Sequence, residues 1–325
     1  MIFCDWHNLL NRGVFPNKDK IIENPDYLSH VTLTMILNLT SKFGASKHNP
    51  MVLCCDSKPT WRHEFYTQNC RNFPEYAVKE GYKGKSLDGF QIYKGDRIKD
   101  DIIPWDRIEE INNDILESLK HNSDFHVVKV PNCEADDIIA VLAKKCANEK
   151  RQCNIVSTDG DFVQCQTQEV NIYNPIKSMF VPETNVEEYK TLHFLLAGDD
   201  NIKNVKRGLG EKTVLKLLPR LDEELQINPE MRARYEFNKS LIDFDRIPDY
   251  ITESILEEWK LHEGKFTYNA QNLIKMFRKY SLNAIGERVM DFKLSDNKKT
   301  TELNSYHERM KQVESWSDNM LENFF

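Results

Sequence analysis

The sequence contains no C-x-x-C pair, no basic N-terminal segment and no apolar run long enough to span a membrane. Four of its eight cysteines lie in or beside apolar runs, namely Cys4, Cys54, Cys55 and Cys153. This placement favours buried free thiols in a reducing compartment such as the cytoplasm over a disulfide framework or a zinc site. The longest fully apolar run, around 138–143, is too short for a membrane helix. We therefore expect neither a secretory signal nor a membrane segment.

The chain also has no overall excess of positive charge, which would normally argue against nucleic acid as a partner. Its 325 residues carry a formal net charge of −7, and 40% are hydrophobic, enough for a core in one large domain or two of ordinary size. The average hides two basic segments. Residues 58–99 contain 9 Lys/Arg against 5 Asp/Glu, and residues 203–220 contain 6 against 1. Charge alone does not separate a phosphate-binding surface from an ordinary solvated face.

Short apolar runs alternate with helical patterns in the first half of the chain. The strand-like runs are residues 2–4, 51–55, 126–130, 154–157 and 170–173. Apolar residues recur at helical spacing over residues 105–120, and a buried helix is indicated after Glu134. This alternation predicts an α/β fold with a mostly parallel, twisted sheet flanked by helices.

Acidic residues lie at or just after the ends of four of these strands. They are Asp5, Asp56, the group Glu134, Asp136 and Asp137, and the pair Asp159 and Asp161. The carboxyl ends of parallel strands open into a common crevice, where seven carboxylates would raise one another's pKa unless cations neutralise them. Mg²⁺ and Mn²⁺ are the natural counter-ions, and such a crevice suits phosphoryl chemistry by paired metal ions.

Each acidic residue also has a structural explanation. Asp5 and Asp137 are explained singly as capping residues, and the segment 159–161 as a polar turn. A packing or hydrogen-bonding role explains His7 better than a role as a metal ligand. The joint occurrence of the carboxylates in one order argues against a purely structural account.

Two segments depart from the α/β alternation. Residues 59–101 mix basic and aromatic side chains, which hold phosphates and stack bases, and form a long connection typical of a functional loop or helical arch. A mobile surface insertion explains this composition as well. Residues 207–213 place two glycines one residue apart before an apolar helix, which allows a backbone phosphate to approach the helix N-terminus.

Taken in order, these motifs resemble the flap endonuclease, or 5′-to-3′ exonuclease, family. The matching positions and segments are Asp5, Asp56, 134–137, 157–162, 198–201 and 208–213, and the segment 241–249 resembles the bacteriophage members. The resemblance covers about residues 1–285. It implies a PIN-like 5′ nuclease fold with a helical arch and a C-terminal DNA-binding region of the helix-hairpin-helix type.

The family resemblance also implies an activity. A metal-dependent, structure-specific 5′ nuclease would hydrolyse phosphodiesters to leave 5′ phosphates. It would remove RNA primers and 5′ flaps during DNA replication, which includes RNase H activity. Branched or nicked DNA and RNA–DNA duplexes would be the substrates, and a single-strand-binding protein is a further expected partner.

The resemblance assigns roles to matched positions. Two Mg²⁺ ions, for which Mn²⁺ would substitute, are expected at Asp5, Asp56, Glu134, Asp136, Asp137, Asp159, Asp161, Asp199 and Asp200. Arg62 and Lys83 match basic arch positions that orient the phosphate. The expected DNA contacts are Tyr82, Lys85, Arg207, Gly208, Gly210, Lys212 and Thr213, with a K⁺ ion at the turn 208–213.

The sequence departs from the family pattern at two places. The family spaces two aspartates as G-D-x-x-D-N, whereas Asp199 and Asp200 are adjacent, so either could complete the second metal site. The basic residue that often lies three positions after the arch lysine is Ser86 here, with Lys85 one position earlier. We therefore expect the phosphate clamp to be shifted or weaker.

The expected organisation is a catalytic domain at 1–190 with its arch at about 59–101, a helical DNA-binding domain at 191–297 and a tail at 298–325. In the tail, the spacing of Leu321, Phe324 and Phe325 resembles sliding-clamp-binding peptides. A terminal helix packed on its own domain is the alternative. Two alternative functions are a PIN-type ribonuclease, which would lack the arch and the glycine turn, and an inactive DNA-binding scaffold.

Overall fold

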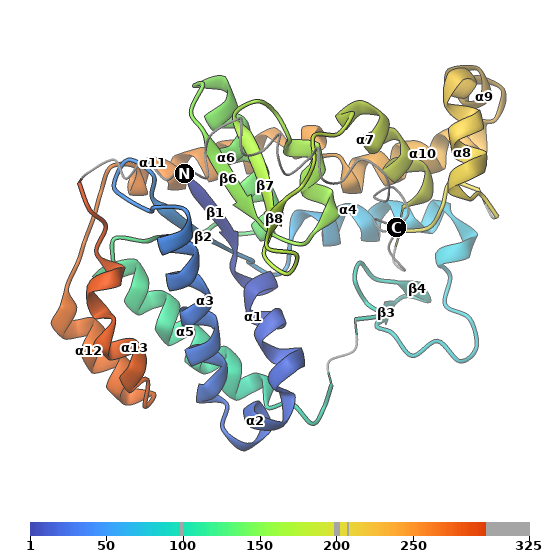
Figure 1. The fold of residues 1–325 in the computed structure, drawn as a ribbon. Coiled ribbons are helices and arrows are strands. Elements are labelled where there is room, and N and C mark those ends of the chain that lie inside the picture. Colours follow the sequence, from blue (N-terminus) through green and yellow to red (C-terminus); the bar gives the residue numbers. More distant parts are fainter. Residues whose placement is uncertain (98–99, 198–201, 207, 297–325) are drawn as a thin grey trace.

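A computed structural model describes residues 1–97, 100–197, 202–206 and 208–296, and a six-stranded sheet forms its centre (Figure 1). The strand order is β5 (His126–Lys129), β2 (Met51–Cys55), β1 (Ile2–Asp5), β6 (Cys153–Val156), β7 (Val170–Asn174) and β8 (Met179–Phe180). All neighbours are parallel except β7 and β8. The mostly parallel α/β sheet predicted from the sequence is therefore confirmed.

The strands are apolar on both faces because helices cover both faces. Ile2 and Cys4 of β1 face one hydrophobic cluster, and Phe3 between them faces the other. A strand buried on both sides reads as a continuous hydrophobic run rather than an alternating one. The short apolar runs in the sequence could therefore identify the strands but could not say which helices would cover them.

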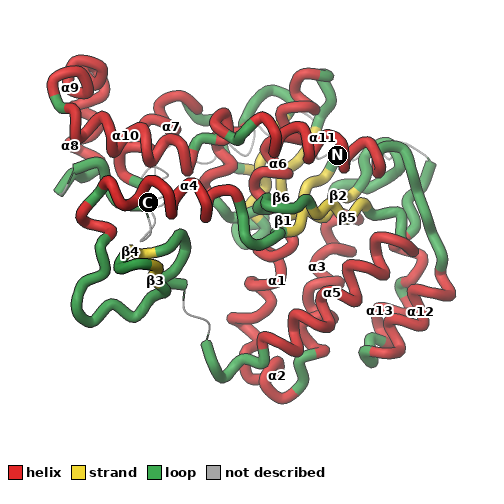
Figure 2. The backbone as a smooth tube through the Cα atoms, turned by 180° about the vertical axis from the view of Figure 1, so that it is seen from behind, coloured by secondary structure: helices red, strands yellow, loops and turns green. Residues whose placement is uncertain are grey.

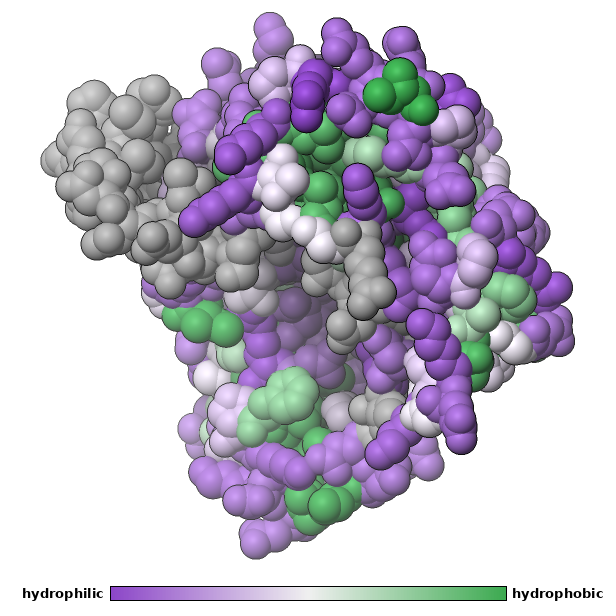
Figure 3. Space-filling view, turned by 90° about the vertical axis from the view of Figure 1, so that its right-hand side faces the viewer, coloured by the Kyte–Doolittle hydropathy of each residue, from purple (hydrophilic) through white to green (hydrophobic). Residues whose placement is uncertain are grey.

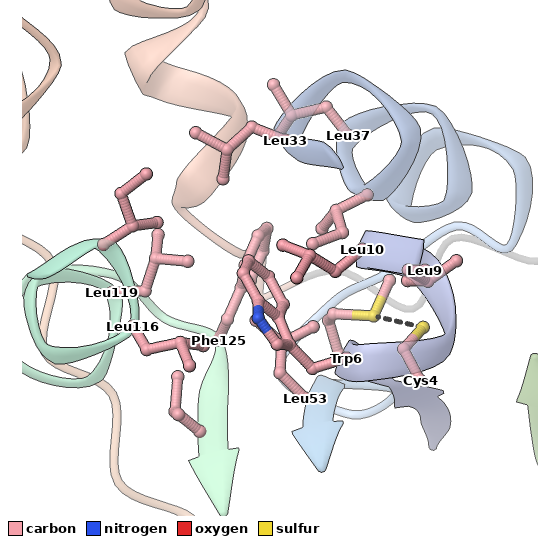
Figure 4. Packing of buried hydrophobic residues seen from close by; sticks show 14 of the residues in the cluster. Cys4, Trp6, Leu9, Leu10, Leu33, Leu37, Leu53, Leu116, Leu119 and Phe125 are labelled. Carbon is pink, nitrogen blue, oxygen red and sulfur yellow. Dashed lines mark hydrogen bonds between the residues drawn. The ribbon is translucent and has the colours of Figure 1, made fainter. Parts of the chain in front are cut away.

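Helices pack on the sheet in two layers (Figures 1 and 2). The first layer comprises α1 (Trp6–Val14), α3 (Asp26–Lys42), α5 (Trp105–Asn122), α12 (Ala270–Lys279) and α13 (Asn283–Glu287), with α2 (Lys18–Glu23) at its end. The second comprises α6 (Ala135–Asn148) and α11 (Asp249–His262). In the first layer, the buried ring of Trp6 packs among leucines of α1, α3 and α5 (Figure 4).

A third hydrophobic cluster lies beyond the sheet. It joins α4 (Trp61–Asn69) to α7 (Val186–Leu196), α8 (Glu211–Leu217) and α10 (Pro229–Ile242), with α9 (Leu221–Ile227) beside them. Aromatic rings dominate the contact, and Phe237 of α10 lies 5.7 Å from Tyr66 and 5.6 Å from Tyr76 between ring centroids. The guanidinium of Arg234 stacks 3.9 Å from the ring of Phe73.

Within the expected arch segment, the described residues form α4, two short 3₁₀ turns and a small hairpin. The turns are Cys70–Asn72 and Pro74–Tyr76, and the hairpin pairs β3 (Ser86–Leu87) with β4 (Phe90–Gln91). The base of the segment is buried in the third cluster, whereas the hairpin extends away from the sheet (Figure 1). Residues 98 and 99 lie outside the described residues.

The packing does not follow the predicted boundary at residue 190. Helix α11 places Ile251, Ile255 and Trp259 in the core of the second layer, and α12 packs against α5. Among the described residues after 190, those that share the third cluster with the arch base all lie within 191–242. The chain returns to the sheet because these later helices carry one apolar face each, which needs a partner surface. No described helix is long and apolar enough to cross a membrane.

His126 on β5 gives the fold a testable sensitivity to acid. Its ring is 3% exposed and lies 5.4 Å from Trp259 and 5.9 Å from His262, and its Nε2 has no hydrogen-bond partner within the described part of the chain. Burial, followed by the positive charge of His262, lowers the pKa of His126 to about 4. The nearby charge of Glu263 acts in the opposite direction.

We expect His126→Phe to reduce the loss of stability on acidification. The ordinary histidine pKa is about 6.5, so the neutral buried ring contributes fully above that pH and loses its contribution as pH falls toward 4. The wild type should lose about 2–3 kcal/mol more than the variant between pH 7 and pH 4.5. Urea unfolding at both pH values measures this, with the exposed His48→Phe as control. Equal losses in wild type and His126→Phe would contradict the assignment.

Candidate functional site

Three strand ends bring acidic residues to one edge of the sheet. Asp5 ends β1 and accepts a hydrogen bond from Asn8 N at 3.0 Å, which caps α1. Asp56 follows β2 and accepts from Ala135 N, at the start of α6, at 2.9 Å. Asp159 follows β6 and accepts from Asp161 N at 2.9 Å, which begins the 3₁₀ turn Gly160–Cys165. Capping thus fixes the backbone at each site while one carboxylate oxygen stays free of these bonds.

These ends open into a cavity of about 830 Å³. Its acidic lining includes Asp5, Asp56, Glu134, Asp136, Asp159 and Asp161. Six of the seven carboxylates expected from the strand ends are therefore brought together. Seen from the side of α8, α9 and the β3–β4 hairpin, the molecule is hollowed near its centre and its surface there is mostly hydrophilic (Figure 3).

The acidic lining holds more negative charge than its surroundings neutralise. Burial raises the pKa of Asp5 to about 7, and the charges of Asp56 and Asp159 add to the rise. Burial also raises the pKa of Asp136, with Asp5 and Asp159 contributing. The pKa of Asp159 is raised by burial and by Asp161. Each of these shifts would be reversed by a cation bound among the carboxylates.

Lys94 brings a positive charge into this acidic cavity. Its Nζ lies 2.7 Å from Oε1 of Glu134, and its side chain is 22% exposed. Burial works to raise the pKa of Glu134, but the charges of Lys94 and Arg62 outweigh it and lower the pKa to about 2. The backbone of Lys94 has φ 54°, a left-handed conformation that costs free energy for a residue with a side chain. Such conformations cluster at functional sites.

Arg62 and Asp137 form a buried pair beside the cavity. Nη1 of Arg62 lies 2.7 Å from Asp137 Oδ1 and 3.2 Å from Glu134 Oε2, and its Nε donates to Leu241 O at 2.8 Å. Asp137 is fully buried, also accepts from Trp61 Nε1 at 3.1 Å, and is absent from the cavity lining. The structure therefore places Asp137 as the partner of Arg62 rather than among the six clustered carboxylates. Arg62 lines the cavity, but its Nε and Nη1 donors are engaged within the protein.

The structure places the expected arch residues away from the carboxylates. Lys83 and Lys85 are exposed, Tyr82 is partly exposed, and none of the three lines the cavity. Lys94 and Arg97 line it instead. The spacing of Lys94 and Arg97 could have identified them in the sequence. The family pattern places a basic residue three positions after the arch lysine, and Lys94 has this partner whereas Lys83 does not.

The register of this loop has a packing cause. Tyr93, next to Lys94, is 5% exposed in the third cluster and lies 3.5 Å from Glu134 through its hydroxyl. Lys85 N donates to Gly95 O at 2.8 Å, and a Cβ on Gly95 would lie 2.7 Å from Lys85 O. The buried tyrosine and the tight glycine contact turn Lys94 inward and leave Lys83 on the outer limb of the loop.

The glycine turn is described in part. Gly208 has φ 77°, Gly210 precedes α8, and Lys212 and Thr213 lie in the first turn of that helix. The expected sites Asp199, Asp200 and Arg207, and the tail residues Leu321, Phe324 and Phe325, lie outside the described residues. The duplex-gripping role of this turn stays a prediction.

A divalent cation fits the chemistry of the cavity. The free donors are carboxylate oxygens, which hard cations prefer, and their raised pKa values reflect the crowding that such an ion relieves. Among the described residues, no group of three or more Asp, Glu, His or Cys side chains is already arranged to hold a metal ion. His7 accepts from Asp56 N at 3.3 Å through Nδ1. This bond accords with a hydrogen-bonding role for His7.

Two further side chains of the cavity were not expected from the sequence. Tyr189 and His193 come from α7 and line the cavity beside Asp161. They lie one helical turn apart in a stretch whose pattern indicates only a helix. No local signal in the sequence distinguishes them.

Comparison of the sequence with known proteins finds nucleases. The family model of the 5′-3′ exonuclease N-terminal, resolvase-like domain matches residues 86–191. Ribonuclease H of enterobacteria phage T4 is 27% identical over 271 residues, 77% of this chain and 81% of that protein. Flap endonuclease Xni of Psychromonas ingrahamii is 30% identical over 186 residues, 53% of this chain and 58% of that protein. The chain matches only 12% of the length of the thermostable DNA polymerase I of Thermus thermophilus, at 39% identity.

Solved structures share the fold. A T5 5′-exonuclease with bound zinc ions superposes with a TM-score of 0.56 at 17% identity, over 82% of this chain and 99% of that one. A T5 D15 flap endonuclease with DNA and metal ions gives a TM-score of 0.52 at 17% identity, over 80% and 98%. The arrangement of sheet and flanking helices is therefore that of these proteins.

Proposed function

We propose that this chain, which belongs to the flap endonuclease and 5′-3′ exonuclease family, is a divalent-metal-dependent, structure-specific 5′ nuclease. The observation that carries the proposal is the cavity at the strand ends, where six carboxylates and Lys94 converge. Such a site combines a place for hard cations with a positive group for a phosphate. The basic segments found in the sequence supply charge for a nucleic-acid backbone despite the net charge of −7.

The substrates we propose are branched or nicked DNA and RNA–DNA duplexes, which would be cut to leave 5′ phosphates. Removal of RNA primers and 5′ flaps would be the role in replication, as the names of the phage T4 and Xni relatives suggest. We further propose Mg²⁺ as the working ion, with Mn²⁺ substituting, and K⁺ at the turn 208–213. Partners would be a single-strand-binding protein and a sliding clamp that binds the tail.

The metal-holding residues would be the cavity carboxylates: Asp5, Asp56, Asp136, Asp159, Asp161 and, indirectly, Glu134. Bound there, divalent ions supply Lewis-acid activation of water and neutralisation of the phosphate charge. Asp199 or Asp200 would add a donor from the segment before the glycine turn. Asp137 would act through Arg62, whose guanidinium it holds in place.

Two cationic side chains would handle the scissile phosphate. Lys94 and Arg97 both line the cavity, and Lys94 pairs with Glu134, so a phosphate drawn into the cavity would meet both cationic side chains. Their charge would offset the negative charge that develops on the phosphate oxygens. Arg62 would hold Glu134 and Asp137 through its buried bonds, which makes it a positioning residue rather than a phosphate ligand.

The test uses a 5′-labelled flap duplex and a matched RNA–DNA hybrid, each incubated with the protein in Mg²⁺ and in EDTA. We expect short 5′ products in Mg²⁺ and none in EDTA, and the two substrates rank flap removal against primer removal. Binding without cleavage would favour the inactive scaffold. Cleavage of unstructured RNA in preference to both duplexes would favour the PIN-type ribonuclease.

A further inference from the structure

Helix α7 faces the turn that carries two of the cavity carboxylates. Asp159 begins this turn and Asp161 is its second helical residue, and the side chain of Asp159 accepts from Asp161 N. A turn of this size fixes its backbone but leaves the Asp161 side chain free to rotate. Two side chains of α7, Tyr189 and His193, contact this turn.

His193 contacts the carboxylate of Asp161 directly. Its Nε2 lies 2.7 Å from Oδ1, and the two side chains are 20% and 35% exposed. An imidazole that engages one carboxylate oxygen restricts the rotation of the carboxylate and leaves the second oxygen for a cation. Hydrogen bonds of this kind to ligating carboxylates tune metal affinity.

Tyr189 fixes the neighbouring peptide. Its ring stacks on His193 at 5.7 Å with an interplanar angle of 17°, and its hydroxyl donates to Gly160 O at 2.8 Å. A Cβ on Gly160 would lie 2.9 Å from that hydroxyl, so the glycine makes room for the bond. The two rings therefore hold both the backbone and one side chain of the turn.

The other side of α7 is anchored independently. Lys190 is buried and pairs with Asp243 at 2.9 Å and with Asp245 at 2.6 Å. These ion pairs set the rotation of the helix about its axis, and that rotation directs Tyr189 and His193 to the cavity. The contact of His193 with Asp161 therefore follows from the packing of α7 and not from the rotation of an unrestrained side chain.

We propose that His193 is a positioning residue for Asp161, supported by Tyr189, and that it raises the affinity of the cavity for divalent metal ions. The proposal rests on the proposed nuclease function. Helix α7, which carries these rings, shares the third cluster with α8, the helix that follows the glycine turn. The helix that positions Asp161 therefore packs with the segment that we propose to meet the duplex.

The experiment measures Mn²⁺ binding to the full chain without DNA. Electron paramagnetic resonance of free Mn²⁺ gives the bound fraction, and Asp161→Asn identifies the binding that depends on Asp161. We expect His193→Leu to weaken that binding about 10-fold and His193→Gln, which keeps a donor near the Nε2 position, to recover most of it. His121→Leu is the matched control, since His121 pairs with Glu117 at 2.9 Å on an exposed face of α5.

Cleavage of the flap duplex provides the second readout. A positioning role predicts that His193→Leu needs more Mn²⁺ for half-maximal rate but approaches the wild-type rate at saturating Mn²⁺. If the variant melts at a lower temperature and binds Mn²⁺ like the wild type, His193 is only structural and the inference fails. If the wild type itself neither binds Mn²⁺ nor cleaves, the proposed function fails, and the inference fails with it.

Discussion

Replacing Asp159 by Asn should lower the rate of flap cleavage by at least 10³-fold while duplex binding persists. The charge of Asp159 raises the pKa of Asp5 and of Asp136, and the charge of Asp161 raises the pKa of Asp159. Asp159 therefore belongs to the group of mutually repelling carboxylates in the acidic lining. An amide keeps an acceptor for Asp161 N, so the local turn is preserved and mainly the charge is lost. Loss of a charged metal donor acts on the transition state rather than on binding of the duplex.

Thermal unfolding distinguishes this loss of catalysis from a loss of structure. Asp159 raises the pKa of Asp5 and Asp136, which means that the three charges repel one another in the folded protein. In EDTA the variant should therefore melt at the wild-type temperature or above it. Asp291→Asn, at an exposed carboxylate paired with Arg288, is the control and should keep wild-type activity. Near-normal turnover of Asp159→Asn would remove this residue from the metal centre.

Replacing Lys94 by Met should reduce the cleavage rate by about 10²–10³-fold, the range found when a single group that stabilises transition-state charge is removed. Nζ of Lys94 lies 2.7 Å from Oε1 of Glu134. The charge of Lys94 also interacts with those of Asp136 and Asp5. Methionine keeps the length of the side chain and removes its charge. The rate of a single turnover at saturating substrate measures the effect without the contribution of binding.

Lys83→Met is the matched control for this prediction. Lys83 is exposed on the outer limb of the same loop and lies outside the cavity lining, so its loss should change the rate by less than about 3-fold at saturating substrate. Weaker duplex binding with a smaller salt dependence is the most that the loss of a distant phosphate contact would cause, because fewer counterions would be released on binding. A larger rate loss for Lys83→Met than for Lys94→Met would restore the sequence-based assignment of the arch lysine.

The contrast between Lys83 and Lys94 shows why local sequence was insufficient. Both follow a tyrosine and precede a glycine, so the two tripeptides are the same. The difference is that Tyr93 is buried against the third cluster, whereas Tyr82 is partly exposed. The ring of Tyr93 packs against His63 and Tyr66 of α4, at 5.3 and 5.9 Å between ring centroids, and Tyr66 in turn packs against Phe237 of α10. No residue next to Tyr93 in the sequence indicates these contacts.

Asp137 and His193 depended on tertiary contacts in the same way. Asp137 sits in an acidic run whose other members face the cavity, and its helical position turns it toward Arg62 instead. His193 has no neighbour in sequence that suggests a metal centre, and only the packing of α7 brings it to Asp161. Side-chain direction around a helix follows from its axial rotation, which the surrounding packing sets.

The sequence was enough to predict the five parallel strands of the sheet and the acidic residues at their ends, but not the antiparallel edge strand β8. These features are local, because a strand buried on both faces is apolar along its whole length. The residues that reach the carboxyl edge of the sheet directly follow each strand in the chain. Which lysine enters the cavity, which aspartate pairs with Arg62 and which helix supports Asp161 follow only from tertiary contacts. Those choices depend on contacts between segments more than 30 residues apart, as between Arg62 and Asp137 or Asp161 and His193. The free energy of such contacts comes from packing and burial that no short stretch of sequence contains.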